Sequence, residues 1–309
     1  MAARAAIELN VFSIIAEAGP GAHLSAAEIT SKMETTNPKS ASTNLDRLLR
    51  FLGANSLLTM AQRPFKNGED IHHEWTYGLT KPTCSPETSS EAGISSTHGV
   101  HFYEYMEKKP TLKRLFNGFL ESTSQAILDE VLKVYGGFEE VKEMLDVGGG
   151  VGASLVKILS VYPHIRGMNL DLAHVIADAA TFPGVEHIAG DMFRSLPHTQ
   201  TILLQRILHN WDDDHCKKLL RNCWEALPDD GKVIVVESVV PQVLANDPET
   251  RYAVAYDLGM MLLLAGGKER TISEFDNLAK AVGFVETKAF PIATSIHVIE
   301  LRKKVMRHP

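Results

Sequence analysis

The sequence has little of what a disulfide-stabilised, secreted or membrane-spanning protein needs. Its three cysteines, Cys84, Cys216 and Cys223, are too few and too irregularly spaced for a disulfide framework or a zinc site. No apolar run reaches the length of about eighteen residues that a transmembrane helix requires. The N-terminal residues 1–10 lack the apolar core and small-residue cleavage site of a signal peptide. We therefore expect a cytoplasmic protein that does not enter a membrane.

Basic charge is also scarce. The chain of 309 residues carries 31 Lys and Arg against 38 Asp and Glu, which gives a net charge of −7. Nucleic-acid phosphates repel an acidic chain, so no nucleic-acid partner is predicted. The apolar fraction of 44% is typical of a folded globular protein and excludes a disordered chain. The length is sufficient for two domains of ordinary size.

The first part of the chain has a helical spacing of apolar residues. The sequence 19–21, Gly-Pro-Gly, separates two helical stretches, and Ser25 to Glu28 reads as a capping box that starts a new helix. Two short apolar segments near residues 57–59 and 75–79 then suggest a small hairpin. Helices followed by a hairpin predict a winged-helix-like unit. Apolar residues that would share helix faces are Ile7, Val11, Ile14 and Ile15, and then Leu45, Leu48, Leu49 and Leu52.

After residue 137 the pattern changes to strands that alternate with helices. This order is typical of an α/β domain with a mainly parallel sheet. We therefore expect an N-terminal domain over residues 1–125 and an α/β domain over residues 126–309. A helix is expected over 213–227. Strands are expected over 143–147, 167–171, 185–189, 201–207, 232–238, 286–290 and 295–301.

A glycine-rich turn follows the first of these strands. It contains Gly148, Gly150 and Gly152, and a helix is expected to begin near Ala153. Glycines allow a tight turn and a close approach of the backbone to a ligand. The spacing differs from that of dinucleotide sites, where the helix N-terminus must meet a pyrophosphate. S-adenosylmethionine has no phosphate, so a different glycine spacing is reasonable for it, and Asp146 lies two residues before the turn.

Acidic residues recur at the ends of the next two strands. Asp171 ends the second strand, where an acid can accept both ribose hydroxyls of a nucleoside. Asp191 closes the third strand and is followed by Met192 and Phe193, which suit the edge and face of an adenine. Each acid alone would be interpreted as a turn or capping residue. Together they predict binding of S-adenosylmethionine at the carboxyl ends of the strands.

A candidate catalytic base follows the fourth strand. His209 lies just past the strand end, and histidine is a suitable general base at neutral pH. A phenol has a pKa of about 10 and is a poor nucleophile until it is deprotonated. Such a base needs an acceptor that orients its other ring nitrogen, and Glu237 and Glu269 are both candidates. Residues 212–214, three aspartates, are interpreted as a helix start rather than a metal site, and His215 as structural.

These motifs together resemble the plant caffeic acid/flavonoid-type O-methyltransferases. The resemblance rests on the sequences at 19–21, 45–50, 145–150, 183–187, 190–193, 209–211 and 266–271, in this order, and covers the whole chain. It implies a class I methyltransferase: a Rossmann-like sheet with an N-terminal, mostly helical winged-helix domain for dimerisation and substrate capping. It also implies a homodimer, S-adenosylmethionine as cofactor and no catalytic metal. The resemblance further implies transfer of the methyl group to a phenolic hydroxyl of a small aromatic plant metabolite.

The resemblance also assigns residues. It makes His209 the base, flanked by Glu237 and Glu269. The cofactor-binding residues that it implies are Gly148, Asp171, Leu172, Asp191, Met192, Phe193, Gln205 and Trp211. The substrate-binding residues that it implies are Phe116, Leu120, Asn210, Met260 and Leu264.

The chain departs from the family pattern at several places. Gln205 stands where the family has a lysine, and Asn210 where it has an aspartate. The segment 79–103 is shorter than in typical members, so caffeic acid is not carried over as the acceptor.

Two other functions remain as alternatives. A member with a remodelled pocket could have lost efficient methyl transfer and catalyse an isomerisation or cyclisation, or be inactive. A winged-helix DNA-binding ligand sensor would need a basic recognition helix, for which Arg47 and Arg50 are the only candidates.

Overall fold

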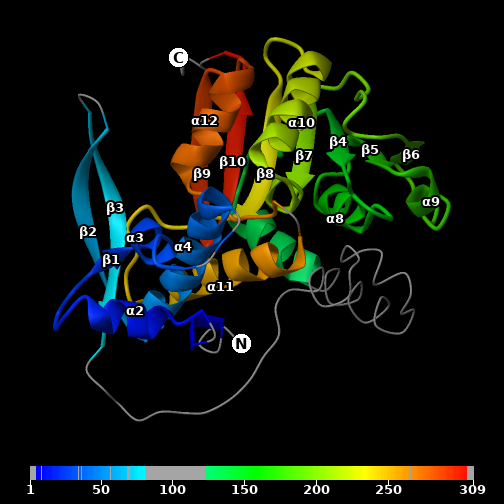
Figure 1. Ribbon diagram of the computed structural model, residues 1–309. Coiled ribbons are helices and arrows are strands. Elements are labelled where there is room, and N and C mark those ends of the chain that lie inside the picture. Colours follow the sequence, from blue (N-terminus) through cyan, green and yellow to red (C-terminus); the bar gives the residue numbers. More distant parts are fainter. Residues whose placement is uncertain are drawn as a thin grey trace. The chain divides into compact units, whose positions relative to one another are not determined.

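The chain forms two compact units, each with its own core. The computed structural model describes residues 5–80 and 123–304, apart from residues 8, 34, 36, 56, 68, 69 and 265. The first unit combines the described residues before 103 with Pro241–Leu263, and the second combines the remainder up to Val240 with the chain from Leu264 onward. Figure 1 shows the elements of both units. In the described ranges, no helix has the length and apolar character needed to cross a membrane.

The first unit contains short helices and a small antiparallel sheet. Ser25 caps α3 with the expected capping box, because its side chain accepts from Glu28 N while the Glu28 carboxylate accepts from Ser25 N. The expected hairpin is confirmed by β2 and β3, which pair over ten residues each. The sheet has the order β1-β3-β2. The elements are α2 (Val11–Glu17), β1 (Leu24–Ser25), α3 (Ala26–Thr30), α4 (Pro38–Ala54), β2 (Leu58–Asn67), β3 (Asp70–Leu79) and α11 (Pro248–Leu263).

Helix α11 packs on α4 inside this first unit. Leu258 of α11 joins the core formed by the apolar face of α4. Arg47 of α4 binds the Asp257 carboxylate through Nη2 at 2.7 Å and Nε at 2.8 Å, and Arg50 binds Asp46 at 2.6 Å. The two arginines that a DNA-binding function would need are therefore engaged within the fold. Although α11 comes late in the sequence, it belongs to the first unit, which a single domain limit at residue 125 does not predict. The limits 1–125 and 126–309 stay a prediction.

The second unit is built on a seven-stranded sheet of order β6-β5-β4-β7-β8-β10-β9. The first five strands in this order are parallel, and β10 and β9 are antiparallel to their neighbours. The expected mainly parallel sheet is thus confirmed. The strand expected to reach Ile207 ends at Gln205, because Arg206 adopts a left-handed backbone with φ of 56°. The strands are β4 (Glu143–Val147), β5 (Arg166–Asp171), β6 (Val185–Ala189), β7 (Thr201–Gln205), β8 (Lys232–Ser238), β9 (Glu286–Ala293) and β10 (Ile296–Arg302).

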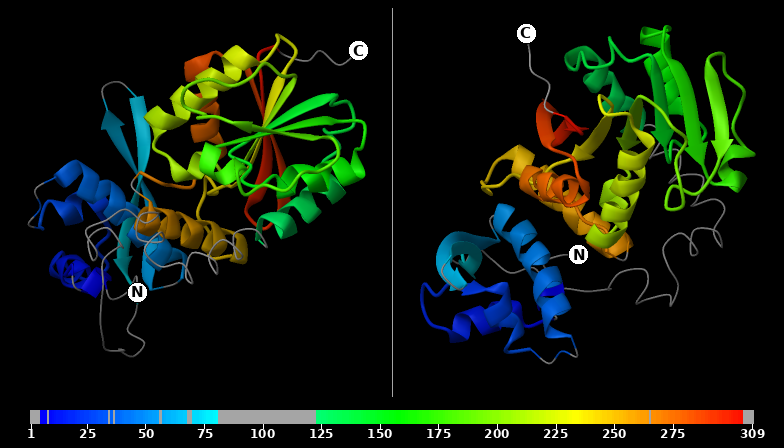
Figure 2. Two further views of the ribbon diagram at one scale, coloured as in Figure 1. Left: turned by 90° about the vertical axis from the view of Figure 1, so that its right-hand side faces the viewer. Right: turned by 90° about the horizontal axis from the view of Figure 1, so that it is seen from above.

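Helices cover both faces of this sheet (Figures 1 and 2). Successive strand residues point to opposite faces, so Leu145 and Val147 belong to one core and Met144 to the other. The first core is closed by α10 (Asp213–Ala226) and α12 (Ile272–Val282). The second is closed by α8 (Ala153–Val161) and the helical residues 123–134. With both faces covered, the carboxyl edge of the parallel strands is where a ligand can reach the sheet.

Candidate active site

The carboxyl ends of four parallel strands bring the predicted site residues into one unit. The glycine turn follows β4, Asp171 ends β5, Gln205 ends β7 and Glu237 is the penultimate residue of β8. His209 lies on the short 3-10 turn Leu208–Asn210, four residues beyond β7. This placement agrees with the rule that ligands of parallel α/β sheets bind at the carboxyl ends of the strands.

The glycine turn adopts a backbone that only glycine accommodates readily. Gly148, Gly150 and Gly152 have φ values of 69°, 60° and 87°. Gly150 N donates to the Asp171 carboxylate at 2.8 Å, which ties the turn to the end of β5. Helix α8 begins at Ala153, as the sequence predicts.

A pocket of about 420 Å³ opens beside this turn. Its lining includes the glycines 148–150, Ser124, Gln125, Asp146 and Gln205. Asp146 has 1% of its surface exposed, and its Oδ2 accepts no hydrogen bond among the described residues. Burial, with a smaller contribution from the Asp171 charge, raises the pKa of Asp146 to about 7. A buried acid facing a pocket without a donor suits a cationic ligand, yet Asp146 is absent from the predicted cofactor residues.

Gln205 also lines this pocket. Its Nε2 donates to the Ser124 carbonyl at 3.0 Å, whereas its buried Oε1 has no hydrogen-bond partner among the described residues. The side chain is therefore held from one end and presents an acceptor, where a lysine would present a donor.

The remaining predicted cofactor residues lie in the segments that follow β5, β6 and β7. Leu172 follows Asp171 directly and is 48% exposed. Asp191 lies two residues beyond β6 rather than at its end, and its Oδ1 accepts from Phe193 N at 2.9 Å. Met192, Phe193 and Trp211 pack partly buried against the core, with the Phe193 and Trp211 rings edge to face at 4.7 Å. Their contacts with a cofactor stay a prediction.

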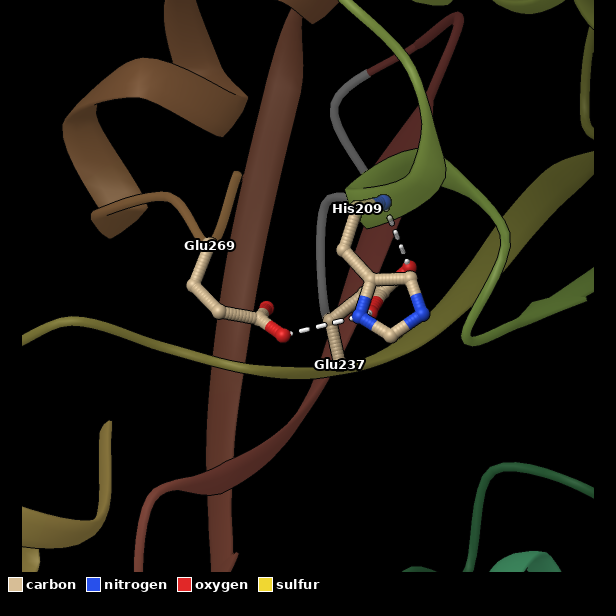
Figure 3. Close-up of side chains that lie close together, drawn as sticks. All are labelled: His209, Glu237 and Glu269. Atoms are coloured by element: carbon tan, nitrogen blue, oxygen red, sulfur yellow. Dashed lines mark hydrogen bonds and ion pairs between the residues drawn. The ribbon is translucent and has the colours of Figure 1, made fainter. Parts of the chain in front are cut away.

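His209 is buried between two carboxylates (Figure 3). Its Nδ1 lies 2.8 Å from Glu269 Oε1 and 3.5 Å from Glu237 Oε2. The backbone N of His209 also donates to Glu237 Oε1 at 3.3 Å. The sequence left open which glutamate contacts the histidine, and the structure brings both to it. The ring hydrogen bond goes to Glu269.

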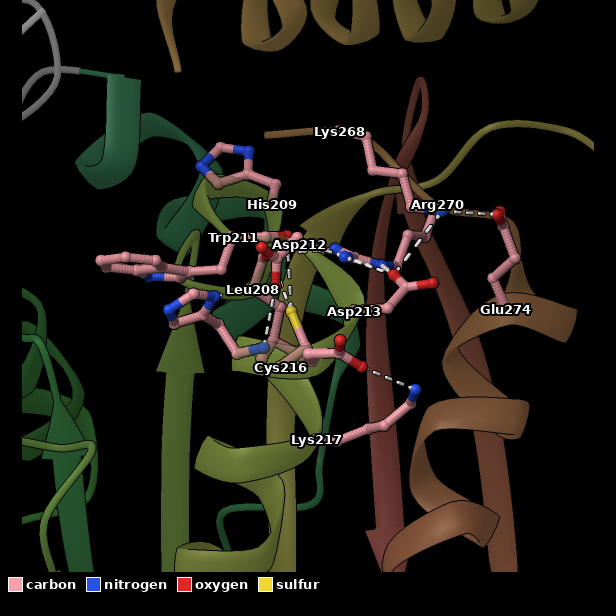
Figure 4. A network of polar contacts seen from close by, with 12 residues as sticks. Leu208, His209, Trp211, Asp212, Asp213, Cys216, Lys217, Lys268, Arg270 and Glu274 are labelled. Carbon is pink, nitrogen blue, oxygen red and sulfur yellow. Dashed lines mark hydrogen bonds and ion pairs between the residues drawn. The ribbon is translucent and has the colours of Figure 1, made fainter. Parts of the chain in front are cut away.

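The segment that carries Glu269 is fastened to the turn that carries His209 (Figure 4). Arg270 is fully buried and donates to the carbonyls of Leu208 and Trp211 at 2.9 and 2.8 Å. On the other side of Glu269, the backbone N of Lys268 donates to the His209 carbonyl at 2.9 Å. The neighbours of Glu269, Lys268 and Arg270, are thus hydrogen-bonded to backbone carbonyls of the turn that carries His209. These contacts fix Glu269 relative to His209. No sequence pattern signals this role of Arg270, because its acceptors are backbone carbonyls.

The charges around His209 change its proton affinity. Burial alone would lower the pKa of His209, but Glu237 and Glu269 outweigh it and raise the pKa above the usual value. Burial raises the pKa of Glu237 to about 6, with the His209 charge acting in the opposite direction. The cluster therefore stabilises a protonated His209 and can receive a proton at this position.

The same three side chains are close enough to be considered as metal ligands. His209, Glu237 and Glu269 each offer one ligand atom, and these atoms lie within 4.8 Å of one another. Histidine binds a metal through a deprotonated ring nitrogen, and Nδ1 here makes the 2.8 Å hydrogen bond to Glu269. The expected absence of a catalytic metal stays a prediction. Asp212 caps α10 through His215 N at 2.9 Å, so the aspartates at 212–214 start a helix as expected.

The predicted substrate residues are distributed over the chain. Asn210 Nδ2 donates to the Arg206 carbonyl at 3.2 Å. Leu264 belongs to the second unit and Met260 of α11 to the first, so a pocket that combines Met260 with His209 stays a prediction. Phe116 and Leu120, with most of the segment 79–103, lie outside the described residues.

Models of two protein families match the chain. One, described as an O-methyltransferase domain, matches residues 86–285. The other, described as an O-methyltransferase dimerisation domain, matches residues 1–82. Together they account for most of the sequence.

Individual proteins agree with these matches. The chain is 47% identical to (S)-scoulerine 9-O-methyltransferase of Coptis japonica, over 98% of this chain and 86% of that protein. It is 39% identical to caffeic acid 3-O-methyltransferase 1 of Populus tremuloides, over 98% and 91% of the two chains. Among solved structures, an O-methyltransferase family 2 protein of Planctomyces limnophilus in complex with apigenin has the same fold. The TM-score is 0.69 at 20% identity, over 98% of this chain and 91% of that one.

Proposed function

The chain belongs to the O-methyltransferase family and uses S-adenosylmethionine, and from this premise we propose that His209 deprotonates a phenolic hydroxyl so that its oxygen accepts the methyl group. The observation that carries the proposal is the burial of His209 between Glu237 and Glu269. A neutral histidine in this position can take a proton and hold it, because two carboxylates stabilise the imidazolium.

The two glutamates act on His209 in different ways. Glu269 accepts from Nδ1 at 2.8 Å, so the tautomer is fixed and Nε2 is left with the lone pair that takes the phenolic proton. Glu237 accepts from the backbone N and adds a second negative charge near the ring. His209 is thereby oriented before the substrate binds, which lowers the entropic cost of the reaction.

The elevated proton affinity of His209 predicts a pH dependence. The base must be neutral to accept a proton, so the rate should rise with pH through the raised pKa of His209. The acidic limb of the pH–rate profile should therefore lie above the usual value for histidine.

The pocket beside the glycine turn fits the cofactor. S-adenosylmethionine supplies an electrophilic methyl group on a sulfonium. The buried acceptor of Asp146 in this pocket suits the positive charge of its methionine portion. Asp171, at the end of β5, suits its ribose hydroxyls. Leu172, Asp191, Met192 and Phe193 would contact the nucleoside, with Gln205 and Trp211 completing the site. The glycine backbone would pass close to the ligand.

The acceptor is proposed to be a phenol on a small aromatic plant metabolite. The named substrates of the relatives, scoulerine and caffeic acid, both belong to this class of molecule. Asn210, Met260, Leu264, Phe116 and Leu120 would contact the ring. The higher identity to the scoulerine enzyme favours an alkaloid phenol as the first compound to test.

The dimerisation domain supports a homodimer formed through the N-terminal domain. Sedimentation should then give about twice the mass of the 34.0 kDa chain, and a concentration-independent monomer would contradict this. A cytoplasmic location stays a prediction.

The test is transfer of a labelled methyl group from S-adenosylmethionine to a panel of alkaloid phenols, phenylpropanoids, flavonoids, stilbenes, coumarins and hydroxyindoles. Cofactor binding is measured by calorimetry alongside, and each assay is repeated with a chelator. Transfer that the chelator does not reduce is expected. Binding without transfer to any compound would favour a remodelled enzyme, and loss of activity on chelation would show that a metal is required.

A further inference from the structure

Two buried oxygen atoms lie beside the glycine turn, and neither has a hydrogen-bond donor among the described residues. They are Asp146 Oδ2 and Asn169 Oδ1, on residues that are 1% and 0% exposed. The two residues are register partners on β4 and β5. The oxygens lie 2.5 and 2.2 Å from the point that a Cβ on Gly149 would occupy. Both oxygens are thus within 2.5 Å of one point, and two buried acceptors left there without a donor are unfavourable, whereas a proton on one of them would supply the missing donor.

The orientation of the Asn169 amide is fixed by contacts on its other side. Its Nδ2 donates to the Gly150 carbonyl at 2.8 Å and lies 3.2 Å from His187 Nδ1. His187 Nε2 lies 2.9 Å from the Ala180 carbonyl, which can only accept. His187 therefore carries its proton on Nε2, and its Nδ1 accepts from Asn169. A flipped amide would place Oδ1 against the Gly150 carbonyl, so Oδ1 keeps its position beside Gly149, which Asp146 Oδ2 also approaches.

We propose that Asp146 is protonated in the cofactor-free enzyme and donates to Asn169 Oδ1, and that binding of the positively charged cofactor releases this proton. The inference rests on the proposed function, because it takes S-adenosylmethionine as the ligand of this pocket. On binding, the O–H bond of the carboxylic acid breaks and the proton leaves to solvent. The carboxylate that remains balances the positive charge of the ligand. Asn169 is then a positioning residue, since the same amide holds Gly150.

The charges around Asp146 agree with this state. Asp171 on β5 is a second negative charge that disfavours ionisation of Asp146, and burial is the larger cause. His187 on β6 contacts Asn169, the residue beside Asp146 on the neighbouring strand. The other polar side chains that line the pocket are neutral: Ser124, Gln125, Ser154 and Gln205. No cation among these residues replaces the proton.

Calorimetry of S-adenosylmethionine binding in buffers of different ionisation enthalpy measures the proton directly. Asp146 should contribute nearly one released proton per site at about pH 6 and almost none at about pH 8, with affinity about tenfold weaker at the lower pH. The amino group of the ligand titrates in the same range. The readout is therefore the difference between the wild type and Asp146→Asn, which keeps a donor to Asn169 but no titratable proton. The exposed control Asp229→Asn should behave as the wild type.

Infrared difference spectra of the cofactor-free protein between about pH 6 and pH 8 decide the same question without ligand. A protonated-carboxyl band is expected in the wild type and in Asp229→Asn. Because Glu237, with a pKa of about 6, also contributes to this band, the readout is the part of the band that Asp146→Asn lacks. If the ligand binds but the wild type and Asp146→Asn differ neither in released protons nor in the band, the inference is overturned and the proposed function stands. If the ligand does not bind at all, the proposed function fails, while the infrared band still decides whether Asp146 is protonated.

Discussion

The two ends of the seven-stranded sheet both bury charged residues, but they satisfy them differently. At the amino end of β8, Lys232 donates to Glu300 at 2.9 Å and to the Gly137 carbonyl at 2.7 Å. Tyr135 and Arg302 also bind the Glu300 carboxylate. Burial alone would raise the pKa of Glu300, yet these three partners together hold it below its usual value. This cluster has the properties of a structural ion pair.

At the carboxyl end, acids outnumber their donors. Asp146 Oδ2 and Glu237 Oε2 are buried and accept no hydrogen bond from the described residues, and burial raises the pKa of both groups. The pocket at the amino end is the larger, about 700 Å³ against 420 Å³. Pocket size would therefore select the amino end, whereas unsatisfied buried acids select the end where the predicted site residues gather.

The largest effect should come from removing the proposed base at the carboxyl end. His209→Gln should lower kcat by about 10²–10⁴-fold, since a positioned general base contributes that much. Cofactor affinity should stay close to the wild-type value, because His209 does not line the pocket beside the glycine turn. Steady-state kinetics with calorimetry checks both. Equal losses in binding and turnover would show that His209 is structural.

Breaking the satisfied cluster should have a large effect on stability alone. Lys232→Met leaves Glu300 buried without its lysine, which should cost about 3 kcal/mol of unfolding free energy. Activity per folded molecule should be unchanged. Chemical denaturation and kinetics give the two values, with Lys280→Met at an exposed pair as the control, expected to cost less than about 1 kcal/mol. A loss of turnover without a loss of stability would show that the Lys232 cluster serves catalysis. The amino end and the carboxyl end would then not differ in role.

Removing one orienting carboxylate should have an intermediate effect and move the pH profile. Glu269→Gln should lower kcat by about 10–100-fold, because His209 would then lose part of the rate enhancement that an oriented general base gives. Glu269 helps to raise the pKa of His209, so its removal lowers that pKa and the acidic limb should shift to lower pH. The pH dependence of kcat measures this, and Glu237→Gln should shift the limb in the same direction. A limb that does not move would mean that another group controls it.

The smallest effect concerns the stability of the cofactor-free protein. The folded pKa of Asp146, about 7, lies above the unfolded value of about 3.9, so proton binding stabilises the folded state. This stabilisation is complete below the unfolded pKa and is lost as pH rises through the folded one. Between about pH 6 and pH 8 the wild type should lose about 1 kcal/mol more than Asp146→Asn. Chemical denaturation at the two pH values measures this difference. An equal change in unfolding free energy for the wild type and Asp146→Asn would contradict the prediction.

The sequence predicts those features of the fold that depend on neighbouring residues. The capping box at Ser25, the start of α8 and the strands of the parallel sheet all follow from local spacing, and the structure confirms them. The left-handed Arg206, which ends β7 early, has no local signal because non-glycine residues rarely adopt it. The packing of α11 on α4 depends on contacts between residues that are 210 positions apart, as with Arg47 and Asp257.

The candidate site divides in the same way. Strand ends and residue types indicate His209, Asp171 and the glycine turn. Which glutamate makes the ring hydrogen bond could not be predicted, because Glu269 lies 60 residues from His209 and reaches it through the Arg270 contacts. The sequence places Asp146 beside the turn but does not mark it as a cofactor ligand, since its importance comes from burial and from a missing donor.

The most direct test of the account compares the wild type with His209→Gln on a series of phenols of decreasing pKa, from about 10 to below about 7. If His209 removes the phenolic proton, its loss should matter most for the weakly acidic phenols. The rate ratio of wild type to variant should fall towards one for phenols that are already ionised at the assay pH. A ratio that stays constant across the series would contradict the role of His209 as the base.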